Sequence, residues 1–243
     1  MAPRRKDTSQ PDIRQLSIFD TDELVDPQMA TEHIPPLAEF AQEWRMRAYR
    51  EYAACAGPSP LKSYAGPARL AFGLLSILED EAPMTVRRLF DVYLRGCGLH
   101  KLGSRLQTLL TEGLQHALKT RRCLVVNESD TSDLLQHIVR LPSQPEIIVR
   151  LRGPRTLEEI PPSELLAVAG YLEYARRLAW NSEAHRRALL HEYELMRLTD
   201  QASAWLDHVL ALERPAVHAL LGAVFQQYAG YNRATRNGSM LSP

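Results

Sequence analysis

The residues of this chain that could do chemistry are eight scattered histidines, three cysteines and a few paired acids, and none has the spacing of a catalytic motif. His191 and Glu192 begin the sequence HEYEL, which lacks the second histidine of the HExxH zinc-protease motif. The chain has no GxxxxGK(S/T) loop for phosphates, no GxSxG nucleophile motif and no CxxC pair for zinc. We therefore expect no enzyme activity, no cofactor and no metal site.

Composition predicts a soluble cytoplasmic protein of one or two domains. Of its 243 residues, 45% are hydrophobic and 24% are charged, which is ordinary for a globular protein. The three cysteines are odd in number and far apart, which fits a reducing compartment, and Cys123 lies in an apolar segment where a buried thiol is expected. No apolar run reaches the roughly 18–20 residues of a membrane helix, and no secretion signal is recognisable.

One stretch, residues 69–127, carries most of the structural signal. Its apolar residues recur at the spacing of an amphipathic helix in three segments. The three predicted helices cover residues 68–81, 86–95 and 104–120. Thr85 and Ser104 have side chains suited to capping the second and third of these helices.

The turn and the strand around these helices predict a winged helix-turn-helix over residues 67–140. Gly96 and Gly98 supply a turn between the second and third helices. A short apolar strand is expected at residues 123–126, and the polar residues 127–130 would then form the wing.

The third predicted helix carries the residues best suited to double-stranded DNA. The last helix of a helix-turn-helix enters the major groove, and its flanks contact phosphate. Residues 61–125 carry 10 Lys and Arg against 5 Asp and Glu, although the net charge of the chain is zero. The predicted DNA-binding residues are Arg87, Arg88, Lys101, Arg105, Thr108, Gln115, Lys119, Arg121 and Arg122. The predicted wing argues against DNA binding, because Glu128 and Asp130 at its tip would repel phosphate.

Residues 1–36 are polar and lack apolar periodicity, which predicts a disordered tail. Within the tail, the sequence QLSIF resembles the QL(S/D)LF motif by which many bacterial replication and repair proteins dock on the sliding clamp. The resemblance implies a contact with the clamp through Gln15, Leu16, Ile18 and Phe19. The alternative is a segment that docks on its own protein or has no partner. A helix over residues 37–56 and a linker to residue 66 are expected next.

Residues 141–232 predict a second helical unit. A segment rich in β-branched residues at 147–152 predicts a strand. The helices expected after it cover residues 165–180, 183–195, 200–212 and 216–228. Asn181 or Ser182 is expected to cap the second of these helices, and Thr199 or Asp200 the third. Residues 99–110 and 195–206 both read Leu-x-basic-Leu followed by a helix, which suggests a second trihelical unit resembling a helix-turn-helix. The expected fold class is mainly α, with few short strands and a loose tail at residues 233–243.

Three segments between residues 69 and 212 resemble the uncharacterised winged-helix-like C-terminal domain of bacterial superfamily-1 helicases encoded on mobile or defence islands. The first is LEDEAPM at residues 78–84, and the second is GLHKLGSR at residues 98–105. The third is VRLR at residues 149–152 followed by RTLEEIPPSE at residues 155–164. That family has no catalytic residues to carry over, and this chain contains no helicase motor. The resemblance implies an accessory role beside a separate helicase.

We therefore expect a non-enzymatic DNA-binding accessory subunit or regulator of a bacterial DNA-processing or phage-defence system. It would work with a separate helicase or nuclease. The alternative is a protein–protein adaptor whose winged-helix units dock on a large partner subunit without touching DNA. The basic balance of residues 61–125 favours the first, whereas the zero net charge and the acidic wing favour the second.

Overall fold

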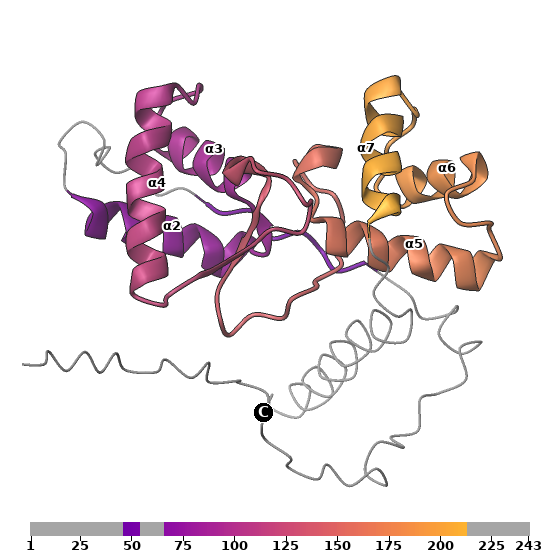
Figure 1. Cartoon of the computed structure of the whole chain (residues 1–243), viewed down its shortest axis with the longest axis horizontal. Coiled ribbons are helices and arrows are strands. Elements are labelled where there is room, and N and C mark those ends of the chain that lie inside the picture. Colours follow the sequence, from indigo (N-terminus) through magenta and orange to yellow (C-terminus); the bar gives the residue numbers. More distant parts are fainter. Residues whose placement is uncertain (1–45, 54–65, 213–243) are drawn as a thin grey trace, which may run out of the picture.

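A computed structural model describes residues 46–53 and 66–212 of the chain. Within these residues the protein is mainly helical, as expected, with six α-helices and one small sheet (Figure 1). The predicted clamp motif at residues 15–19, the predicted helix at 216–228 and the tail at 233–243 lie outside the described residues. None of the helices in the described part is long and apolar enough to cross a membrane.

The first unit, residues 66–141, contains three helices and the sheet. The helices are α2 (Pro67–Glu81), α3 (Val86–Gly96) and α4 (Ser104–Lys119). The strands are β1 (Met84–Thr85), β2 (Leu124–Val126) and β3 (Ile138–Arg140). They are antiparallel in the order β1-β3-β2, and Val139 of β3 pairs with both Met84 and Val125. The chain order is therefore helix, strand, helix, helix and hairpin.

Local signals explain where these helices begin and end. The Thr85 side chain accepts a hydrogen bond from the Arg88 backbone N–H at 3.2 Å, which confirms the predicted cap of α3. The turn after α3 places Gly98 at a φ of 73°, which a glycine adopts without strain. The cap of α4 is Gly103, and Ser104 is instead the first residue of the helix, so the predicted serine cap is wrong.

The core of the first unit forms where α2 and α4 pack together. Its buried residues include Leu74, Phe90 and Leu114, and Cys123 joins them with 1% of its surface exposed. Burial raises the pKa of Cys123 to about 11, so this thiol behaves as a small apolar side chain, as its sequence context predicts.

Gly113 and Gly170 form a matched pair for testing this packing. A Cβ at Gly113 would lie 2.7 Å from the Leu70 Cβ and 3.4 Å from the Ala71 backbone nitrogen, so α2 and α4 would have to separate. We expect Gly113→Ala to cost about 1–3 kcal/mol of unfolding free energy. Gly170 lies inside α5 with open space at its Cβ, and Gly170→Ala should stabilise the protein by about 0.5–1 kcal/mol. Urea denaturation measures both changes, and equal effects would contradict the close helix contact.

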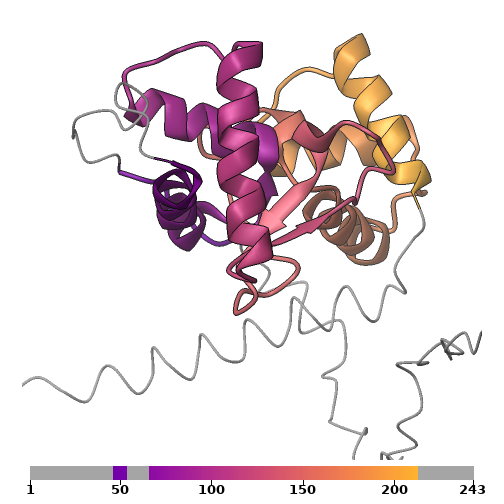
Figure 2. The same ribbon diagram turned by 60° about the vertical axis from the view of Figure 1, so that its left-hand side comes forward.

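The second unit, residues 142–212, contains α5 (Pro162–Arg176), α6 (Glu183–Glu192) and α7 (Asp200–Ala211). The short 3₁₀ turn η2 (Leu157–Glu159) lies in the connection before α5, whereas η1 (Leu134–Gln136) lies in the first unit, between β2 and β3. The predicted capping positions are confirmed at Ser182 and Thr199, whose side chains accept from the His185 and Ala202 backbone N–H groups. Figure 2 shows the small sheet between the helices of the first unit and α5.

Two predicted elements are wrong in the described residues. Residues 46–53 are extended and do not continue the expected helix at 37–56. Residues 147–152 form no regular strand, and only Arg150 makes a bridge, which is parallel and pairs with Arg47. The Arg47 N–H donates to the Val149 carbonyl at 3.2 Å, and its carbonyl accepts from the Leu151 N–H at 2.8 Å. Two extended segments thus lie side by side, so backbone pairing replaces the local helical preference.

Candidate nucleic-acid interface

One face of α4 presents a polar stripe to solvent. Arg105, Thr108, Gln115 and Lys119 are exposed and recur at the three- and four-residue spacing that places them on one side of the helix, with the half-buried Glu112 between them. The opposite side is buried through Leu110, Gly113, Leu114 and Ala117. The amphipathic pattern therefore turns the four predicted residues of this helix outward together. Thr108 also donates to the Ser104 carbonyl at 3.1 Å and keeps acceptor capacity.

Basic residues flank the stripe at both ends. Lys101 is exposed in the loop before α4, and Arg121 and Arg122 are exposed directly after it. At the end of α4, the Arg122 N–H donates to the Ala117 carbonyl at 3.0 Å. Arg121 has a left-handed φ of 55°, which is common just after a helix. Among the described residues, no acid lies within ion-pair distance of Lys101, Arg105, Lys119, Arg121 or Arg122. These five cations lie on α4 or in the segments directly before and after it, and we call them the α4 basic face.

The start of the loop between β2 and β3, which the sequence predicted to be an acidic wing tip, docks on the second unit. Glu128 is half-buried, and its Oε2 accepts from the Ser163 N–H at the start of α5 at 2.9 Å. Burial raises the pKa of Glu128, and the hydrogen bonds from Ser163 oppose that rise. The Ser129 carbonyl lies 2.9 Å from the His208 Nε2 of α7, and Asp130 is exposed. One of the two acids expected to repel phosphate is therefore engaged inside the protein.

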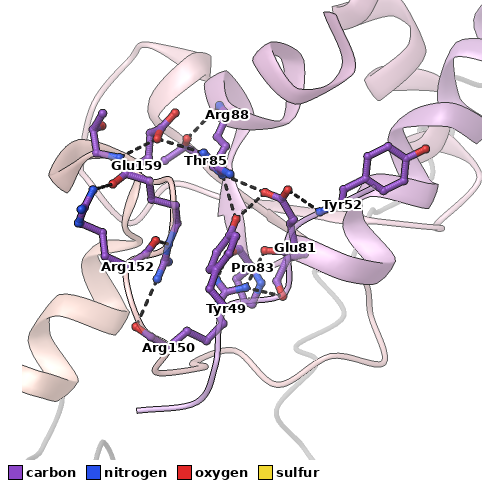
Figure 3. A network of polar contacts seen from close by, with 12 residues as sticks. Tyr49, Tyr52, Glu81, Pro83, Thr85, Arg88, Arg150, Arg152 and Glu159 are labelled. Carbon is purple, nitrogen blue, oxygen red and sulfur yellow. Dashed lines mark hydrogen bonds and ion pairs between the residues drawn. The ribbon is translucent and has the colours of Figure 1, made fainter. Parts of the chain in front are cut away.

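Arg88 does not lie on the surface, which corrects its place among the predicted phosphate contacts. Its side chain is 1% exposed, with Nε 2.9 Å from the Glu81 Oε2 and Nη1 3.2 Å from the Glu159 Oε2 (Figure 3). Its neighbour Arg87 is exposed and lies 3.9 Å from Asp91. Adjacent residues on a helix point about 100° apart, so one of the two arginines faces inward.

Arg88 belongs to a buried network that joins the two units to residues 46–53. The guanidinium groups of Arg88, Arg150 and Arg155 lie 5.5, 5.3 and 4.8 Å from the centre of the Tyr49 ring. The Tyr49 hydroxyl donates to Glu81, and Figure 3 shows it reaching in from the extended segment. Burial, followed by the hydrogen bond to Glu81, raises the pKa of Tyr49, so it stays an uncharged donor.

The second half of the network centres on Glu164, which is 1% exposed. Arg155 binds it through two bonds, Nη1 to Oε2 at 2.8 Å and Nη2 to Oε1 at 3.0 Å. Arg150 spans the units, donating from Nη1 to the Glu81 carbonyl and from Nη2 to the Pro83 carbonyl, both at 2.7 Å. These contacts fix the first unit against α5 and so hold the α4 basic face in one orientation relative to the second unit.

This buried network was not predicted from the sequence. Its signal was the clustering of Arg150, Arg152 and Arg155 ahead of Glu164, which is too many charges for an ordinary connector. A cluster of charges beside apolar residues 147–149 predicts buried pairing, because an isolated buried charge is costly.

Comparisons with protein-family models, with curated proteins and with solved structures gave no match for this chain. The resemblance to the helicase-associated domain therefore stays a prediction from the three sequence segments.

Proposed function

We propose that this protein is a non-enzymatic winged-helix DNA-binding protein that serves as an accessory subunit or regulator of a bacterial DNA-processing or defence system. The observation that carries the proposal is the α4 basic face. The order helix, strand, helix, helix and hairpin, with sheet order β1-β3-β2, supports it, because α4 would be the recognition helix in a winged helix of this order. The separate helicase or nuclease partner rests on the sequence resemblance.

The roles on the α4 basic face follow from side-chain chemistry. Arg105 and Gln115 can form paired hydrogen bonds with base edges in the major groove, and Thr108 can contact either base edges or phosphate. Lys101, Lys119, Arg121 and Arg122 at the flanks suit backbone phosphates, which position the helix without reading sequence. The docked wing leaves α4 as the main contact surface, since Glu128 is held at the start of α5.

Binding of the full chain to a fluorescently labelled duplex across a salt series tests this proposal. If the five cations of the α4 basic face each displace condensed counterions from the duplex, affinity should fall on the order of 10²- to 10³-fold between about 50 and 200 mM salt. Fluorescence anisotropy measures the dissociation constants. An affinity that does not change with salt, or no binding at low salt, would overturn the DNA-binding proposal.

The second candidate function is a protein–protein adaptor. The zero net charge of the chain favours it, and Phe72 on α2 and Met196 before α7 are apolar side chains that a partner could cover, at 64% and 89% exposure. In that role the α4 basic face would meet carboxylates of a partner subunit instead of phosphates. Absence of duplex binding in the salt series would favour this function over the first.

A further inference from the structure

An open pocket of about 480 Å³ lies between α3, the loop that leads into α4 and the segment around η2. Its lining combines basic side chains, among them Arg87, Arg95, His100 and Lys101, with two acids and a few apolar residues. A volume of this size is in the range of pockets that hold small organic ligands. The pocket is therefore large enough for a phosphate group together with part of the molecule that bears it.

The two acids of the pocket are already compensated. The Glu159 Oε2 accepts from Arg88 Nη1 at 3.2 Å and from the Thr156 N–H at 2.8 Å. Asp91 lies 3.9 Å from Arg87, and burial raises the pKa of its carboxyl. The remaining charge of the pocket is therefore positive.

The other basic side chains of the pocket retain donor capacity. Within residues 46–53 and 66–212, Arg95, His100 and Lys101 have no acid at ion-pair distance, and all three are exposed. Arg88 lines the same pocket from the protein interior, and its buried Nη2 has no hydrogen-bond partner among the described residues. Guanidinium and ammonium donors that converge on one space suit the tetrahedral oxygens of a phosphate.

We propose that this pocket binds a phosphate group, supplied either by a phosphorylated small molecule or by a nucleic-acid backbone. Arg95 and Lys101 meet the phosphate at the rim, and Leu94, Leu102 and Pro154 contact the organic part of the ligand. The pocket does not depend on duplex binding by α4, because only Lys101 belongs to both surfaces. It therefore adds a ligand site to the proposed function without resting on it.

Titration of the ¹⁵N-labelled full chain with sodium pyrophosphate, followed by amide chemical shifts, tests the proposal. Saturable shifts are expected for residues of α3, of the loop at 97–103 and of the segment at 154–159. Arg95→Ala should weaken pyrophosphate binding about tenfold or more, because a charge-assisted bond is lost. Arg187→Ala removes an exposed arginine of α6 outside the pocket and should leave binding unchanged. No saturable shifts, or equal affinities for the two variants, would overturn the phosphate site.

Repeating the titration with a duplex present separates the two sources of phosphate. If pyrophosphate displaces the duplex and Arg95→Ala weakens both, the pocket holds a backbone phosphate. If both ligands bind together and Arg95→Ala affects pyrophosphate alone, the pocket serves a phosphorylated small molecule. If pyrophosphate binds in the pocket while the wild type binds no duplex, the phosphate site stands and the DNA-binding function is wrong.

Discussion

Replacing Glu164 by alanine is expected to lower the free energy of unfolding by about 3–5 kcal/mol, because it leaves two buried arginines without their carboxylate. Glu164 and Arg155 are each 1% exposed and are joined by two bonds of 2.8 and 3.0 Å. The Glu164 Oε1 also accepts from the Arg150 N–H at 3.0 Å. Urea denaturation followed by circular dichroism measures the loss, and the slope with urea shows whether unfolding stays two-state.

Glu183→Ala is the matched control for this change. Glu183 also lies in the first turn of a helix, but its ion pair with Arg187 is exposed, with 64% and 69% of the two side chains accessible. Such a pair contributes about 0–1 kcal/mol. Glu164→Gln keeps acceptor capacity while removing the charge and should fall between the two. Comparable losses for Glu164→Ala and Glu183→Ala would show that the buried network does not hold the units together.

Features set by neighbouring residues were predictable from the sequence. The caps at Thr85, Ser182 and Thr199 were recognisable because each side chain bonds a backbone N–H only three residues along the chain. The helical segments were recognisable for the same reason, since their apolar faces repeat within a few residues. Helix ends were less predictable, and α5 ends at Arg176, before the expected residue 180, where Arg177 adopts a left-handed φ of 50°.

Features set by distant contacts were not predictable. Tyr49 was assigned to a helix, yet its hydroxyl bonds Glu81, 32 residues away, and accepts from Arg88, 39 residues away. A Cβ at Gly153 would lie 2.8 Å from the Tyr49 ring, so the loop at Gly153 is also shaped by this distant residue. Contacts of this kind leave no periodic pattern in the sequence, and they override helix propensity.

In the candidate site too, exposure set by the helical period was predictable, and burial set by distant partners was not. The exposure of Arg105, Gln115 and Lys119 follows from the helical period, so the sequence placed them on one face. The burial of Arg88 follows from its partners Glu81 and Glu159, and Glu159 lies 71 residues away. Residues that carried the family resemblance, including Glu81, Pro83, Arg150, Arg155 and Glu164, meet in the buried network. The first and third of those segments thus encode the joint between the units, whereas the second segment, residues 98–105, contains Lys101 and Arg105 of the α4 basic face.

The triple variant Arg105→Ala, Arg121→Ala and Arg122→Ala is expected to lose about 10²- to 10³-fold in duplex affinity at about 0.1 M salt, with a salt dependence flatter by about 2.7 in logarithmic slope. Each arginine brings one positive charge that displaces condensed counterions from the duplex, Arg121 and Arg122 beside phosphates and Arg105 in the groove, so three such charges are removed. All three side chains are exposed, so folding should be unchanged. Anisotropy titrations of the labelled duplex at several salt concentrations measure both quantities.

The control variant removes the same charge from the second unit through Arg177→Ala, Arg187→Ala and Arg197→Ala. These arginines are also exposed, and Arg177 has a left-handed φ of 50°, close to the 55° of Arg121, so both variants place an alanine in the same backbone region. A general effect of net charge would weaken both variants equally, because each loses three positive charges. A selective loss in the first variant locates the phosphate contacts on the α4 basic face. Equal losses would place duplex binding elsewhere, and α4 would then not be the recognition helix.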